Sequence, residues 1–72
     1  MTTALKATIQ QAWATKVHTE LDTGTDELGF AWSDQDGLHV QLGWNEHELE
    51  EIGVFADVGT AYETTVRELV HD

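Results

Sequence analysis

The sequence predicts a small α+β domain in which an N-terminal helix, a central antiparallel β-hairpin and one or two C-terminal helices share a core. Two observations support this prediction. Apolar residues recur every four positions over the first part of the chain, which is typical of an amphipathic helix. Over 27–44 they alternate with small or polar residues, which is typical of strands. Because 72 residues is the size of one domain, we expect 1–72 to fold as a single unit.

The first helix is predicted over residues 4–21. Residues spaced by four form an apolar stripe on one broad face: Leu5, Ile9, Trp13, Val17 and Leu21. Gly24 follows within an acidic segment, and glycine suits the left-handed turn that ends many helices. We therefore expect the helix to end shortly before Gly24.

The β-hairpin over 27–44 is the clearest signal in the chain. Two alternating segments flank a short turn at 34–37 that contains Asp-Gly. We expect one face to carry the large apolar residues of both segments: Leu28, Phe30, Trp32, Leu38, Val40, Leu42 and Trp44. The other face would be small and polar. All three tryptophans, including Trp13 of the first helix, are therefore expected in the core.

The segment after the hairpin has two interpretations. Asn45 followed by Glu48 is typical of a helix-capping pair and favours a helix over 46–55. Apolar residues also alternate there, which would suit a third strand over 52–58. We prefer the helix, although Gly53 would weaken it by up to ~1 kcal/mol.

A final helix is predicted over 61–70, after a capping pair formed by Thr60 and Glu63. A two-stranded sheet is only marginally stable by itself. The helices, a third strand or a second copy of the chain would have to complete it. A homodimer is therefore one of the expected arrangements.

We expect neither an enzyme nor a metalloprotein. The chain has no cysteine, so it has no thiolate ligand or nucleophile. Ser33 is the only serine and lacks a nucleophile-elbow motif. Carboxylate pairs need an enclosed pocket to separate their pKa values, and small chains rarely build one. The four histidines are His18, His39, His47 and His71, and no two of them are three or four residues apart, as a metal site on a helix requires. We expect no catalytic residue, metal or cofactor.

The net charge is −11, because 14 Asp and Glu face 3 Lys and Arg. Such a charge repels phosphate, so we expect no direct binding to nucleic acid or anionic membranes. The aromatic and aliphatic content argues against a disordered acidic tail. The first six residues lack a hydrophobic signal core, and apolar runs are too short to span a membrane. We expect a cytoplasmic protein of a microbe or a phage-infected cell.

The acidic residues gather in three patches, which we predict to bind a basic partner protein. They lie in the first loop, at the hairpin tip and in the segment after the hairpin: Asp22, Asp26, Glu27, Asp34, Asp36, Glu46, Glu48, Glu50 and Glu51. A rigid array of carboxylates can occupy the nucleic-acid-binding groove of another protein, and long-range attraction would speed association.

The predicted function is therefore inhibition of a nucleic-acid-binding complex or nuclease. Phage anti-CRISPR and anti-restriction proteins, and immunity proteins against nuclease toxins, offer an analogy of size and charge. Two alternatives stay open. The acidity can reflect adaptation to high salt, or the protein can be an adaptor subunit with no inhibitory role.

Overall fold

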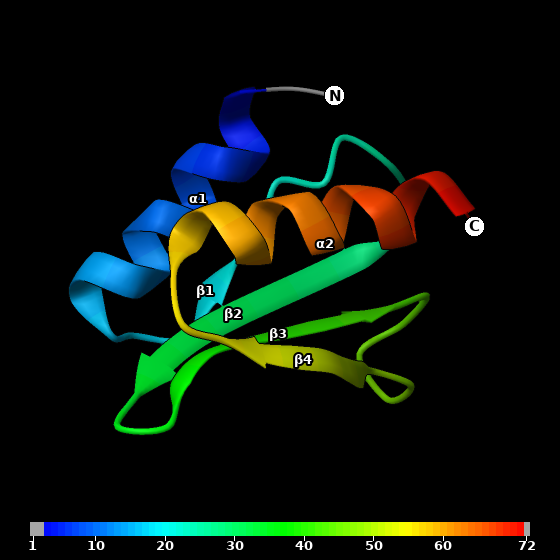
Figure 1. Ribbon diagram of the computed structural model, residues 1–72. Coiled ribbons are helices and arrows are strands. Elements are labelled where there is room, and N and C mark those ends of the chain that lie inside the picture. The colour runs from blue at the N-terminus through cyan, green and yellow to red at the C-terminus, as the bar shows by residue number, and fades with distance from the viewer. Residues whose placement is uncertain (1–2, 72) are drawn as a thin grey trace.

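Two helices pack on one face of a four-stranded antiparallel sheet, and the opposite face of the sheet is left uncovered by them (Figure 1). The computed structural model describes residues 3–71. The elements follow in the order α1 (Thr3–Thr15), β1 (Thr19–Glu20), β2 (Leu28–Asp34), β3 (Gly37–Gly43), β4 (Glu50–Phe55) and α2 (Val58–His71). Each strand pairs with the next one along the chain. The predicted α+β class is confirmed, with more strands than the hairpin alone provides.

Helix α1 is shorter than predicted. Lys16 adopts a left-handed backbone conformation with φ of 61°, and its N–H bonds to the carbonyl of Ala12 at 3.0 Å. This residue takes the C-terminal position that we expected near Gly24. Thr19–Glu20 then pairs with β2 instead of continuing the helix. Val17 consequently leaves the predicted stripe and is 63% exposed.

The hairpin of β2 and β3 is confirmed, but the prediction of a single large apolar face is wrong. The connection has only two residues, so Asp34 pairs with Gly37 and Ala31 with Val40. Even-numbered positions of β2 therefore lie opposite odd-numbered positions of β3 and share a face with them. Large residues of the two strands end up on opposite faces. Leu38, Val40 and Leu42 are buried toward the helices, whereas Leu28, Phe30 and Trp32 are half-buried on the uncovered face.

The preferred helix over 46–55 is also wrong, because residues 50–55 form strand β4 beside β3. The alternative of a third strand is closer, although β4 begins and ends earlier than 52–58. Asn45 forms a single turn instead of starting a helix. The Oδ1 of Asn45 accepts the N–H of His47 at 2.9 Å, and the carbonyl of Asn45 accepts the N–H of Glu48 at 3.1 Å. Pairing with β3 then outweighs the local preference for a helix.

The core lies between the sheet and the two helices. Its buried members come from α1, β2, β3, α2 and the loop after β1: Leu5, Ile9, Ala12, Leu21, Ala31, Leu38, Val40, Leu42, Ala61 and Leu69. The tryptophans do not belong to it, which corrects the prediction. Trp13 is 40% and Trp44 is 60% exposed. Helix α2 begins earlier than predicted because Asp57 caps it, with Oδ1 accepting the N–H of Thr60 at 2.7 Å.

None of the described helices is long and apolar enough to cross a membrane. The four strands also come from one chain, so a two-stranded sheet no longer argues for a second copy.

Candidate functional site

The structure regroups the predicted partner-binding carboxylates. Glu27, Glu48 and Glu50 line one cavity at the end of the sheet. Asp34 and Glu51 flank His39, with Asp36 beside them. The remaining members lie in loops and are exposed: Asp22, Asp26 and Glu46. Three patches defined along the sequence thus become two places where carboxylates meet in space.

The first place is a cavity of about 550 Å³, which we name the acidic cleft. It lies where the end of β3, the loop over 44–49, the start of β4, the loop before β2 and the last part of α2 converge. Its walls combine four carboxylates with apolar side chains: Glu27, Leu42, Gly43, Trp44, Glu48, Leu49, Glu50, Ile52 and Glu68. Glu27 is buried at 6% exposure, whereas the other three glutamates are exposed.

Gly43 positions the loop that forms one wall of the acidic cleft. A Cβ atom at this position would overlap the carbonyl oxygen of Glu48 and lie 3.0 Å from the Cα of Leu49. Only glycine allows the two backbone segments to approach this closely. The turn at Asn45 folds the loop back toward β3. The loop therefore carries Glu48 to the end of the sheet, where Glu50 of β4 also lies.

The cleft has the chemistry of a site for an organic cation with an apolar stem. Its carboxylates can accept charge-assisted hydrogen bonds from a guanidinium or ammonium group. Trp44 exposes an indole ring, whose face attracts such cations. Leu42, Leu49 and Ile52 supply apolar surface for the stem. An anion would meet only repulsion from these carboxylates.

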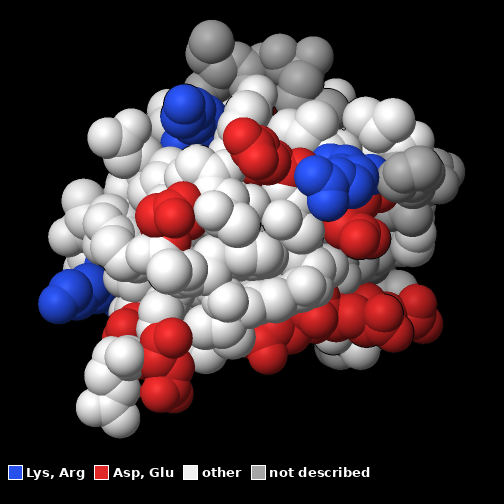
Figure 2. Space-filling model, viewed as in Figure 1, with Lys and Arg blue, Asp and Glu red and all other residues white. Residues whose placement is uncertain are grey.

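The surface view agrees with this grouping. Figure 2 shows red side chains gathered along the lower right, where β4 begins in Figure 1, and a second red group at the lower left, at the turn between β2 and β3. The blue side chains of Lys and Arg lie on the helical side of the same view. The largest red groups of this view therefore lie at the two ends of the sheet, while separate red side chains also lie among the blue ones on the helical side.

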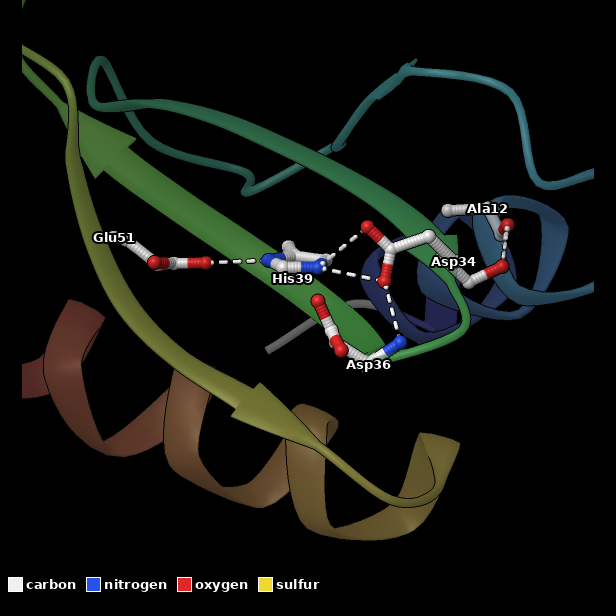
Figure 3. A network of polar contacts seen from close by, with 6 residues as sticks. Ala12, Asp34, Asp36, His39 and Glu51 are labelled. Atoms are coloured by element: carbon white, nitrogen blue, oxygen red, sulfur yellow. Dashed lines mark hydrogen bonds and ion pairs between the residues drawn. The ribbon is translucent and has the colours of Figure 1, made fainter.

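The second place is centred on His39, on the uncovered face of the sheet (Figure 3). Its Nδ1 lies 2.6 Å from Oε1 of Glu51, and its Nε2 lies 2.9 Å from Oδ2 of Asp34. The hydrogen bond to Glu51, followed by the one to Asp34, raises the pKa of His39. The hydrogen bond from His39, supported by the N–H of Asp36, lowers the pKa of Asp34. The His39 side chain is 14% exposed, against 43% for each carboxylate partner.

A row of stacked rings continues from His39 across the uncovered face. Trp32 stacks on His39 with ring centroids 4.9 Å apart and planes inclined by 2°. His18 stacks on Trp32 at 5.1 Å and on Phe30 at 5.2 Å. We did not predict this row. The two-residue length of the hairpin turn was the signal that could have placed Trp32 and His39 opposite each other.

Comparison with known proteins identifies no relative. No protein-family model matches the chain, and neither the curated proteins nor the solved structures yielded a match. The acidic cleft and the surroundings of His39 are therefore interpreted from their own geometry.

Proposed function

We propose that this protein is an acidic protein-binding module that inhibits a nucleic-acid-binding protein by occupying its basic surface. The observation that carries the proposal is the acidic cleft, where four carboxylates and an exposed tryptophan line about 550 Å³. This volume lies within the range of about 300–1,000 Å³ that is typical of ligand pockets.

An arginine side chain of the partner matches the cleft in each of its parts. The planar guanidinium can pair with the carboxylates of Glu48 and Glu50 through several N–H groups at once. Its methylene stem can lie along Leu49 and Ile52, and its plane can approach Trp44. Arginines that bind phosphate in the partner would then be engaged by carboxylates, which excludes nucleic acid from the same surface.

The remaining charge supports the approach of such a partner. A net charge of −11 attracts a basic surface over several ångströms of solvent and raises the association rate. The attraction is screened over about 8 Å at physiological salt. It therefore speeds the encounter with a basic protein but discriminates little between one basic protein and another. Selectivity would come from the contacts made inside the acidic cleft.

The proposal is tested with nona-arginine as a defined basic probe, using isothermal titration calorimetry. A cleft variant combines Glu48→Gln, Glu50→Gln and Glu68→Gln. A control variant combines Asp26→Asn, Glu46→Gln and Glu63→Gln, which removes equal charge from exposed positions.

We expect the cleft variant to bind about tenfold more weakly than the control variant, since it loses specific charge-assisted hydrogen bonds as well as general attraction. Equal weakening of both variants would show that only net charge matters and would overturn the proposal. Inhibition is measured by the release of a labelled DNA duplex from nona-arginine. The wild type should release it at lower concentration than the cleft variant.

Adaptation to high salt, the alternative explanation of the acidity, predicts a different dependence of folding on salt. A protein adapted in this way unfolds in dilute buffer and refolds in concentrated salt. The inhibitor proposal requires a cooperative thermal transition in dilute buffer. Circular dichroism at low and high salt separates the two functions before any partner is known.

A further inference from the structure

The turn between β2 and β3 brings together three side chains of metal-binding type. One donor atom from each of Asp34, Asp36 and His39 lies within 4.8 Å of the others (Figure 3). We propose that these residues bind a divalent transition-metal ion of the zinc type, with Glu51 orienting His39. This site is separate from the acidic cleft and does not depend on the proposed inhibitory function.

The strongest argument is the orientation of the imidazole. Nδ1 of His39 is held by Glu51 at 2.6 Å, which leaves Nε2 directed at the two oxygens of Asp34, at 2.9 and 3.0 Å. Histidines that ligate metals commonly donate their other ring N–H to a carboxylate, which fixes the tautomer and the ring. A cation at Nε2 would replace the Nε2 proton as the partner of Asp34, while Nδ1–H is still donated to Glu51.

The surrounding backbone holds the ligands in place before any ion binds. Oδ1 of Asp34 accepts the backbone N–H of Asp36 at 2.8 Å, which fixes the first carboxylate. Trp32 stacks on the imidazole almost in parallel. Gly37 has φ of 130°, and a Cβ there would lie 2.7 Å from the carbonyl oxygen of Phe55, so the turn is seated closely against the end of β4. The exposed Asp36 side chain supplies the third donor atom, within 4.8 Å of those of Asp34 and His39.

The donor set selects the class of ion. One imidazole nitrogen with carboxylate oxygens suits zinc and similar first-row ions, and three protein ligands leave a position for water. Calcium and magnesium prefer oxygen ligands alone, so they would gain little from His39. The three residues come from one hairpin and are separated by only two and three positions, so the spacing between histidines alone does not indicate this site.

The test is isothermal titration calorimetry of the full chain with zinc chloride, with magnesium chloride as the comparison. We expect one zinc ion per chain and much weaker binding of magnesium. His39→Gln should weaken zinc binding at least tenfold, and Glu51→Gln by about 10–100-fold because the ring loses its orienting partner. His47→Gln is the matched control, since His47 is an exposed histidine 4.0 Å from Glu46. It should bind zinc like the wild type.

Asp36→Asn provides a second variant that keeps the proposal falsifiable if His39→Gln disturbs the sheet. Asp36 is exposed at the turn, so the substitution should leave the circular dichroism spectrum unchanged and still weaken zinc binding. Equal zinc affinity in His39→Gln and the wild type would overturn the proposal. Magnesium binding as tight as zinc binding would also overturn it, because that result indicates only a general attraction of cations to the acidic surface.

Discussion

A methyl group at Gly43 is the sharpest perturbation of the acidic cleft. The added Cβ of Gly43→Ala would overlap the carbonyl oxygen of Glu48 and lie 3.0 Å from both the carbonyl carbon of Glu48 and the Cα of Leu49. All three atoms belong to the backbone, so no side-chain rotation relieves the contact. The loop over 44–49 has to move away from the end of β3, and the wall of the cleft moves with it.

The loss in free energy of unfolding follows from what is known of overpacked protein interiors. Forcing a methyl group into a closely packed position typically costs about 1–3 kcal/mol. In a domain of this size, each kcal/mol changes the melting temperature by about 4–8 °C. A loss of about 2 kcal/mol would therefore lower the melting temperature by about 8–16 °C, and the displaced loop should also weaken binding of nona-arginine.

Gly59→Ala is the matched control for this measurement. Gly59 lies in the first turn of α2, where a Cβ would meet only Oδ1 of Asp57, at 3.4 Å. Alanine is favoured over glycine inside a helix by about 0.5–1 kcal/mol, so this variant should melt a few degrees above the wild type. Thermal melts followed by circular dichroism compare the two. If Gly43→Ala melts at or above the wild-type temperature, the described loop position is wrong.

Two further outcomes follow from the packing and the caps. Leu38→Ala should lower the free energy of unfolding in guanidinium by about 2–5 kcal/mol because Leu38 is fully buried, whereas Trp44→Ala should lower it by less than about 1 kcal/mol because Trp44 is 60% exposed. Equal losses would contradict the burial of these two side chains. The hydrogen bond from the N–H of Thr60 lowers the pKa of Asp57 in the folded state. The stability that ionised Asp57 contributes is therefore fully present above the unfolded pKa of 3.8 and is lost as pH falls through the folded pKa. Asp57→Asn should therefore flatten the acid side of the stability profile, and an unchanged acid side would refute this role of the cap.

The elements with strong periodicity could be predicted from the sequence. The stripe containing Leu5 and Ile9 correctly placed α1, and alternation correctly placed β2 and β3. The end of α1 could not be read in the same way, because Lys16 adopts the left-handed conformation that glycine usually takes. Where α1 ends depends on the pairing of the segment that follows it, which is the pairing of β1 with β2.

The faces of the hairpin and the state of 50–55 were missed for a different reason. Alternation within each strand says nothing about how two strands are aligned, and the two-residue turn set that alignment. At Asn45 the local signal for a helix was real, but it formed only one turn before β4 paired with β3. Pairing between distant segments outweighs local propensity when it buries apolar surface.

The acidic cleft was the least predictable feature, although several of its members were named as partner-binding residues. Glu27, Glu48 and Glu68 come from three separate segments, and only the folded chain brings them around Trp44. The net charge of the chain led to the prediction of a basic partner. The place where that partner would be held required the register of the sheet and the path of the loop over 44–49.

Chemical-shift mapping tests directly whether the acidic cleft binds basic side chains. The ¹⁵N-labelled protein is titrated with nona-arginine at physiological salt, and amide and indole resonances are followed. We expect the largest shifts at the Trp44 indole and at the amides of Gly43 and Leu49, which line the cleft. Shifts of equal size spread over all exposed acidic residues, or confined to the turn between β2 and β3, would contradict it.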